Sequence, residues 1–423
     1  MIEKQPSCAD DKEPGLLPVS EALQRIYRLV PRIQEAESVP LREALGRVLA
    51  ADVASRIDVP GYTNSAMDGY AICSADLPAE GEASLTITGS AFAGRPFDGQ
   101  VGQGEAVRIM TGAVMPDGAD TVVIQERCEA DGDMLRIDGS TAPAANVRYA
   151  GEDVRKGETI LEAGELLMPA HLGMLASLGV SEVKVTRRLK VAFMSTGDEL
   201  LPLDGGFREP ARGEIFDSNR YSIYGMLSRL GVEVIDLGVV RDEPGLIGDA
   251  FQRAAAQADV VISSGGVSVG EADFVSDILH RMGDVAFWKL AMRPGRPLAC
   301  GKLGDAVFFG LPGNPVAVMV AFYEFVQPAL RTMSGVRHSQ STPPRFRVRS
   351  TSELRKSEGR TEFQRGILYT DESGETVVRS TGKQGAGRLS SMCSANCIIV
   401  IDPGRGNIQA GEYVEVQPFH GLV

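Results

Sequence analysis

VVISSGGVSVGEADF, residues 260–274, is the stretch on which the interpretation of this chain depends. The apolar run at its start is typical of a buried strand, and from residue 274 apolar side chains recur at helical spacing until Gly283. The glycine-rich loop between them permits positive φ angles and close approach of the backbone to a ligand. Free N–H groups at the start of the following helix favour an oxyanion such as phosphate. The stretch therefore predicts a strand, a binding loop and a helix.

The same composition is also typical of a tight structural turn in an α/β protein. Neither a Gly-Lys-Ser/Thr ending nor a G-x-G-x-x-G spacing is present, so known phosphate-loop signatures do not decide between the two interpretations. Its candidate residues are Ser264, Gly265, Gly266 and Ser268 for binding and Asp273 for acidic chemistry.

Strand and helix patterns alternate around this stretch. Strands are predicted at 189–194, 232–237, 260–264 and 306–310, and helices at 218–230, 246–258, 274–282 and 314–333. Such alternation predicts a mostly parallel sheet with helices on both faces, in which ligands bind beyond the carboxyl ends of the strands. Polar or glycine-rich loops follow four of these strands, at 195–199, 241–243, 264–273 and 311–315. We therefore expect one binding crevice there.

Charged residues in these loops indicate the chemistry. Glu199, Asp242 and Asp273 are carboxylates beside turns, and such groups bind magnesium and activate water. Residues 288–297 carry three cations, Lys289, Arg293 and Arg296, in a proline-containing and non-helical context. A solvated basic face is the alternative, but fixed cations of this kind bind phosphate-like oxyanions. Together they predict a site for a phosphoanhydride and its metal ion.

The remaining chain divides into further domains. Residues 1–15 have no apolar signal core and predict a flexible tail and a cytoplasmic location. Residues 16–56 carry predicted helices at 19–30 and 41–51, and with residues 149–187 they form an extended N-terminal domain. Residues 57–148 alternate as a small β domain. Residues 188–335 are the α/β domain, and residues 336–423 predict a small C-terminal β barrel or sandwich with a structural role.

Composition limits the class of protein. A length of 423 residues predicts several domains, and a net charge of −13 argues against nucleic-acid or acidic-membrane partners. Apolar runs stay far short of the roughly 18 residues that a spanning helix needs. Six scattered cysteines are typical of reduced thiols, and the spacing of Cys393 and Cys397 is a weak zinc signal. Oxygen ligands are expected for any divalent metal.

Six ordered motifs carry a family resemblance. They are NSAMDGYA (64–71), RIMTGA (108–113), STGDEL (195–200), the loop at 264–274, MRPGRPL (292–298) and GLPGNPV (310–316). Together they resemble the MoeA-type molybdopterin molybdenumtransferases, the family shared with the gephyrin E domain. The resemblance spans the chain from about Leu16 onward.

This resemblance implies a four-domain, elongated homodimer with a MogA-like α/β domain. Its cleft would lie between the small β domain of one subunit and the α/β domain of the other. The implied reaction inserts molybdate into adenylylated molybdopterin, with magnesium-dependent cleavage of the adenylate to AMP. By motif, the site would comprise Asp68, Thr111, the acidic residues Glu199, Asp242 and Asp273, the cations Lys289, Arg293 and Arg296, and Pro297 and Asn314. Many relatives have lysine where Arg296 stands.

Two other functions stay open from the sequence. A molybdopterin adenylyltransferase would also use a MogA-like domain, although the N-terminal half and the Asp68 motif favour the insertion step. A gephyrin-like scaffold is the second alternative, although the fused adenylyltransferase domain of such a scaffold is absent from this sequence. An adenylyltransferase and cofactor-accepting enzymes are the expected partner proteins.

Overall fold

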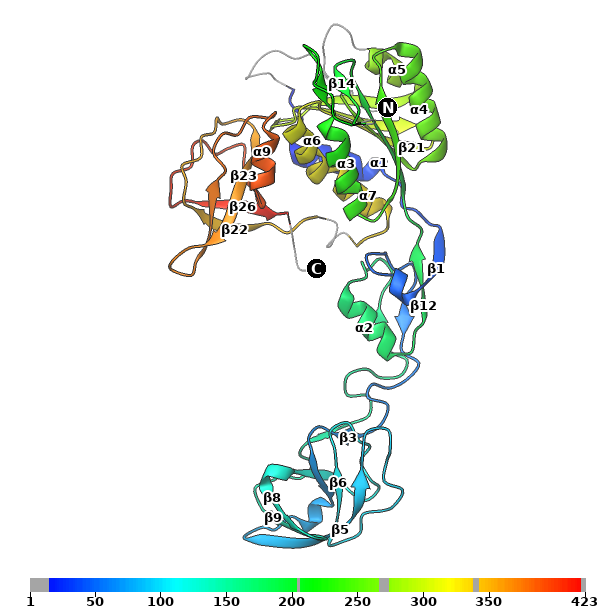
Figure 1. Cartoon of the computed structure of the whole chain (residues 1–423), viewed down its shortest axis with the longest axis vertical. Coiled ribbons are helices and arrows are strands. Elements are labelled where there is room, and N and C mark those ends of the chain that lie inside the picture. The colour runs from blue at the N-terminus through cyan, green and yellow to red at the C-terminus, as the bar shows by residue number, and fades with distance from the viewer. Residues whose placement is uncertain (1–14, 204–205, 266–273, 338–341, 420–423) are drawn as a thin grey trace. The chain divides into compact units, whose positions relative to one another are not determined.

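The computed structural model describes residues 15–203, 206–265, 274–337 and 342–419. The chain divides into two compact units, whose elements are labelled in Figure 1. Unit 1 comprises Met1–Ala50, Gly164–Pro169 and Val183–Val423, and unit 2 comprises Ala51–Ala163 and Ala170–Glu182. The narrower domain limits expected from the sequence stay a prediction.

A six-stranded sheet forms the centre of unit 1, in the order β16-β13-β17-β21-β20-β18. Its strands are β13 (Lys190–Thr196), β16 (Glu233–Val240), β17 (Val260–Ser264), β18 (Gly283–Lys289), β20 (Pro297–Leu303) and β21 (Ala306–Leu311). The first four strands in that order run parallel, whereas β20 and β18 join as antiparallel neighbours. The prediction of a mostly parallel sheet is confirmed.

Helices cover both faces of this sheet, as predicted (Figure 1). One face carries α1 (Val19–Leu29), α3 (Ser218–Arg229), α6 (Pro315–Ala321), a π-helical turn (Phe322–Val326) and α7 (Gln327–Met333), and the other carries α4 (Pro244–Gln257) and α5 (Phe274–Met282). Successive strand residues point to opposite faces. Val191 and Phe193 of β13 therefore pack with Ile223 of α3, while Ala192 and Met194 pack with the α4 side chains.

The predicted helix at residues 41–51 is wrong. Only a 3-10 turn (Leu41–Glu43) forms, and Val48 and Leu49 make strand-like bridges. Gly46 adopts a φ of +72°, which ends any helical path at this point. The apolar spacing fits both structures, and tertiary pairing decides between them.

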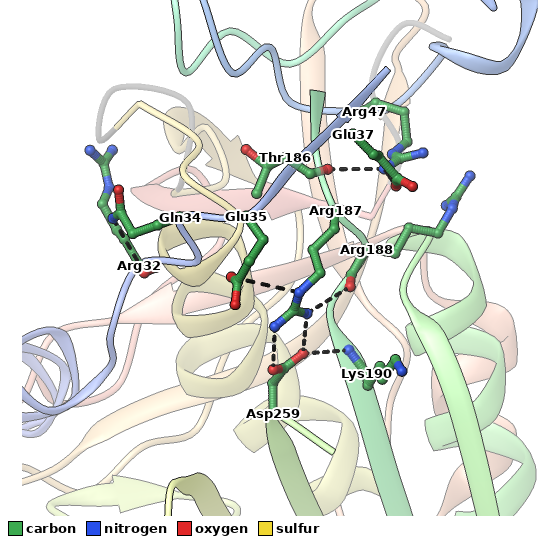
Figure 2. A network of polar contacts seen from close by, with 10 residues as sticks. All are labelled: Arg32, Gln34, Glu35, Glu37, Arg47, Thr186, Arg187, Arg188, Lys190 and Asp259. Carbon is green, nitrogen blue, oxygen red and sulfur yellow. Dashed lines mark hydrogen bonds and ion pairs between the residues drawn. The ribbon is translucent and has the colours of Figure 1, made fainter. Parts of the chain in front are cut away.

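A polar network surrounds the ribbon of β1 (Ala36–Pro40) and β12 (Glu182–Thr186) where it meets the sheet (Figure 2). The Arg187 guanidinium donates to both carboxylate oxygens of Asp259, at 2.7 and 2.8 Å. The Lys190 N–H donates to the same carboxylate at 2.8 Å. Because Asp259 immediately precedes β17, these bonds hold the start of β13 to the start of its neighbour.

The C-terminal part of unit 1 is a closed barrel, which confirms the predicted β barrel. It contains β22 (Phe346–Ser350), β23 (Thr361–Thr370), β24 (Thr376–Ser380), β25 (Cys397–Ile401), β26 (Tyr413–Pro418) and a short helix, α9 (Leu389–Ser394). β23 pairs with both β24 and β25, which closes the ring, and β19 (Met292–Arg293) adds to β23. Phe363, Ile398 and Val400 of the barrel belong to the same buried cluster as the helices of the sheet.

Unit 2 contains the predicted small β domain, a sheet in the order β7-β4-β6-β5-β9-β8. Its strands are β4 (Gly69–Ile72), β5 (Glu82–Ala91), β6 (Glu105–Ile109), β7 (Thr121–Ile124), β8 (Cys128–Asp131) and β9 (Met134–Asp138). Two small two-stranded sheets pair β3 (Asn64–Ser65) with β10 (Val147–Arg148) and β2 (Val53–Ala54) with β11 (Thr159–Leu161). An α-helix, α2 (Pro169–Ser177), follows them in the chain. In the described parts of both units, no helix has the length and apolar character needed to cross a bilayer.

Candidate functional site

A cavity of about 610 Å³ opens at the carboxyl ends of the parallel strands of unit 1. We call it the crevice. It is lined by Thr196, Gly197, Glu199, Asp242, Ile247, Gly265, Val275, Arg293, Pro294, Gly295, Arg296, Pro297, Pro312, Gly313, Asn314, Ala317, Gln384, Gly385 and Ala386. After β13 the chain forms β16 on one side of that strand, and it then returns to form β17 on the other side. Open α/β sheets bind ligands where the strand order reverses in this way. All four predicted loops contribute to the lining.

The acidic side of the crevice is formed by Glu199 and Asp242. Gly197 has a φ of +147°, which other residues rarely adopt, and a Cβ there would lie 2.5 Å from a Glu199 carboxylate oxygen and would push that side chain aside. The Asp242 N–H donates to Asp198 Oδ1 at 3.2 Å, which joins the two loops. Loss of hydration, then the negative charges of Asp198 and Glu199, raise the pKa of Asp242.

This donor set fits a magnesium ion in part. Among the described residues, no three His, Cys, Asp or Glu side chains converge as a complete set of metal ligands. Mg²⁺ nevertheless binds proteins through one or two carboxylates and completes its shell with water and substrate phosphate oxygens. Glu199 and Asp242 can supply those carboxylates, and a cation there would offset the repulsion that raises the pKa of Asp242.

The basic side is built by the turn between β18 and β20. Arg293 and Arg296 line the crevice, and Gly295 between them has a φ of +91° that L side chains rarely adopt. The Arg293 guanidinium is exposed and lies 3.6 Å from Glu362 Oε1. Pro297 lines the crevice beside Arg296. Lys289, the third predicted cation, is buried at the end of β18 and does not belong to the described lining.

The glycine loop that begins at Ser264 is described only in part. Gly265 lines the crevice, with a φ of +90° and its backbone packed against Thr196. Ser264 is buried instead, and its Oγ accepts from the Asn219 amide at 2.9 Å. The same amide donates to the Gly313 carbonyl at 2.7 Å, so Asn219 ties two of the crevice loops together.

Three predicted residues of that loop, Gly266, Ser268 and Asp273, lie outside the described residues. Their roles stay predictions. Asn314 lines the crevice at the start of α6, and its side chain makes no capping bond within the part that the structure describes.

The barrel also contributes to the crevice, which the sequence did not predict. Gln384, Gly385 and Ala386 line it, and the Val316 N–H holds this loop by donating to the Ala386 carbonyl at 3.0 Å. The barrel therefore reaches the crevice, and its expected structural role stays a prediction. The glycine spacing at 382–387 was the signal available, since such loops allow close approach to a ligand.

Arg365 of β23 is a second feature that the sequence analysis missed. Its side chain is almost completely buried and donates to neutral groups, Ser391 Oγ at 3.1 Å and the Gly385 carbonyl at 3.2 Å. Burial, with a smaller effect of Arg293, lowers the pKa of Arg365 to about 10. It lines a second cavity of about 580 Å³ that shares Arg293 and Gly385 with the crevice. The positively charged residues around the crevice therefore include one from the barrel, Arg365, which lines the adjoining cavity.

Unit 2 brings together the other two predicted residues, Asp68 and Thr111. Asp68 Oδ1 accepts from both the N–H and the hydroxyl of Thr111, each at 2.7 Å. These two hydrogen bonds lower the pKa of Asp68, with a small contribution from Arg108. The carboxylate is therefore held in one orientation at the end of β6. A catalytic role for this pair stays a prediction.

Comparison with known proteins identifies the family. Residues 17–179 match the MoeA N-terminal region (domain I and II), residues 192–332 a probable molybdopterin binding domain, and residues 347–419 the MoeA C-terminal region (domain IV). A molybdopterin molybdenumtransferase of Haemophilus influenzae is 43% identical over 96% of this chain and 100% of its own length. The chain belongs to the MoeA family of molybdopterin molybdenumtransferases.

Other members of the MoeA family agree with this assignment. A molybdopterin molybdenumtransferase of Nostoc is 37% identical over 94% of this chain and 93% of its own length. The crystal structure of a molybdopterin biosynthesis MoeA protein from Pyrococcus horikoshii aligns with a TM-score of 0.83 and 30% identity. That alignment covers 96% of this chain and 100% of the other. The family and fold resemblance predicted from the motifs is confirmed.

Proposed function

We propose that this chain inserts molybdate, as substrate, into the dithiolene of adenylylated molybdopterin and cleaves the adenylate, releasing AMP and molybdenum cofactor. The relatives' shared name, molybdopterin molybdenumtransferase, supports the transfer reaction. The observation that carries the proposal is one crevice in which Glu199 and Asp242 line the same cavity as Arg293 and Arg296. Such a combination suits a phosphoanhydride, whose oxygens need cations and whose cleavage needs an activated water.

The chain's own residues have distinct roles in this proposal. Arg293 and Arg296 bind the oxyanions of molybdate and of the phosphates. Water adds to one phosphorus of the anhydride, the bridging oxygen leaves with the other phosphate, and the water's proton passes to a base. A carboxylate of the crevice that does not hold the metal ion can accept that proton.

We also propose that the reaction depends on Mg²⁺. Glu199 and Asp242 would hold the ion, and Asp273 is expected to join them. When bound, magnesium supplies positive charge for the phosphate oxygens. The two arginines then need to neutralise only the remaining charge.

The test is a purified assay with adenylylated molybdopterin, molybdate and Mg²⁺. AMP should appear in a one-to-one ratio with cofactor able to activate a molybdenum-free apoenzyme. Omitting Mg²⁺ should abolish AMP release. Consumption of ATP by the chain with unmodified molybdopterin would instead establish an adenylyltransferase and contradict the proposal.

We further propose a homodimer in which Asp68 and Thr111 of one subunit act with the crevice of the other. Asp68→Asn and Asp242→Asn homodimers should each be inactive. When equal amounts of the two variants exchange subunits, half of the dimers contain one subunit of each variant. In such a mixed dimer, one of the two sites has both a native Asp68 and a native Asp242. About a quarter of native activity should therefore return. No recovery despite verified exchange would contradict the shared site.

A further inference from the structure

Three hydroxyl groups near the carboxyl ends of β13 and β17 have no hydrogen-bond partner among the protein groups that the structure describes. They belong to Ser195, Thr196 and Ser263. All three side chains are buried, with exposed fractions of 0%, 4% and 0%. A buried hydroxyl without a partner costs free energy, because its hydrogen bonds to water are lost and not replaced. Each of them therefore calls for an explanation.

Thr196 differs from the two serines because it lines the crevice. It is the last residue of β13, so its side chain stands at the rim of the sheet where the parallel strands end. Ser195 points to the opposite face, since side chains alternate along a strand. Ser263 lies inside the sheet, in register with Met194, and is not part of the described lining.

The backbone of Gly265 packs closely against Thr196. A Cβ built on Gly265 would lie 3.2 Å from Thr196 Oγ1 and 2.6 Å from the Thr196 carbonyl oxygen. Gly265 itself lines the crevice. Any other side chain at position 265 would therefore crowd the carbonyl and the hydroxyl group of Thr196.

We propose that the Thr196 hydroxyl donates a hydrogen bond to a phosphate oxygen of the bound substrate. The inference rests on the proposed function and adds a binding residue to it. A phosphate oxygen accepts hydrogen bonds, and a threonine hydroxyl can donate one. A phosphate oxygen would also satisfy the buried hydroxyl of Thr196, which is the one of these three residues that lines the crevice.

The test compares AMP binding by the native chain, Thr196→Val, Thr196→Ser and Ser263→Ala, using calorimetric titration. Thr196→Val keeps the shape of the side chain and should weaken AMP binding about tenfold, the effect of losing one hydrogen bond to a charged group. Thr196→Ser should bind nearly as the native chain does. Ser263→Ala is the matched control, because it removes an orphaned hydroxyl outside the crevice lining, and its AMP affinity should be unchanged.

Two further measurements separate binding from structure. Both Thr196→Val and Ser263→Ala should unfold at or above the native midpoint temperature, since each removes an unsatisfied buried group. The loss of AMP affinity in Thr196→Val should persist in EDTA; a loss seen only with Mg²⁺ would overturn phosphate contact in favour of metal contact. Native affinity in Thr196→Val would overturn the inference alone. Absence of AMP binding by the native chain would overturn the proposed function and this inference together.

Discussion

At the scale of single residues, the crevice depends on a few side chains held in unfavourable surroundings. Loss of hydration, and then the nearby carboxylates of Asp198 and Glu199, raise the pKa of Asp242. Gly197 and Gly265 accept backbone angles that other residues avoid, and so keep space for neighbouring groups. Such arrangements cost stability and are typical of functional sites.

Replacing Asp242 by Asn should abolish AMP release while making the fold slightly more stable at pH 7. The folded-state pKa of Asp242 is raised, so its ionised form destabilises the fold above that pKa, and the penalty disappears as pH falls towards the unfolded value of 3.8. The extra stability of Asp242→Asn over the native chain should therefore shrink as pH falls from the folded-state pKa of Asp242 towards 3.8. The effect is small because Asp242 loses only part of its hydration, and the remaining water screens the charges of Asp198 and Glu199. Denaturant unfolding from pH 7 to 4 measures it, and a destabilised variant at pH 7 would contradict it.

Replacing Gly265 by Ala should destabilise the fold by about 2 kcal/mol, since Ala at a φ of +90° is strained and its Cβ would lie 2.6 Å from the Thr196 carbonyl oxygen. Gly313→Ala is the control in the same crevice, because a Cβ there meets nothing within 4 Å. Its unfolding midpoint should stay near the native value. Equal midpoints for the two variants in thermal unfolding would refute the steric explanation.

At the scale of elements, polar links hold β17 to β13 at one end and to the loop after β21 at the other. At the amino ends, Arg187 and Lys190 bind the carboxylate of Asp259 (Figure 2). At the carboxyl ends, Asn219 joins the Ser264 hydroxyl to the loop after β21. These polar links fix the register of parallel strands whose apolar side chains alone would tolerate slippage.

Replacing Asp259 by Asn should cost about 2 kcal/mol of unfolding free energy at pH 7, because it breaks a partly buried two-pronged ion pair. Burial alone would raise the pKa of Asp259, but hydrogen bonds from Arg187 and Lys190 lower it. The stabilisation is therefore complete above the unfolded value of 3.8 and lost as pH falls through the lower folded value.

Glu21→Gln, in an exposed helical pair with Arg25, is the matched control for that variant and should cost only about 0.4 kcal/mol. Urea unfolding of both variants at pH 7 compares them. A similar small loss for both would show that the Arg187–Asp259 pair is no stronger than a surface pair.

At the scale of the whole molecule, the buried apolar clusters described for unit 1 are separate from those of unit 2. Leu85 belongs to the core of the small β domain, and Leu227 to the core shared by the sheet helices and the barrel. Because the barrel shares that core, we expect it to unfold together with the α/β domain. Unit 2 should unfold as a separate cooperative step.

Leu85→Ala and Leu227→Ala should therefore lower different transitions in a calorimetric scan. Each substitution removes a buried leucine side chain and should cost about 3 kcal/mol in its own unit. A scan with one transition that both variants shift would contradict independent unfolding.

The sequence by itself determined the two β domains, the four parallel strands of the central sheet and the polar loops that follow them, but not the strands β18 and β20. It did so because hydrophobic periodicity, turn residues and strand-end loops are local signals. The helix expected at residues 41–51 failed because long-range pairing of Val48 and Leu49 overrode the local pattern.

Only the tertiary structure decided which of the predicted residues meet. It placed Glu199, Asp242, Arg293, Arg296 and Asn314 around one cavity, buried Lys289 and Ser264, and added the barrel loop at Gln384. These are contacts between segments far apart in the chain, and local spacing carries no information about them. The same reason hid Thr196, since an orphaned hydroxyl is defined by its surroundings and not by its neighbours in sequence.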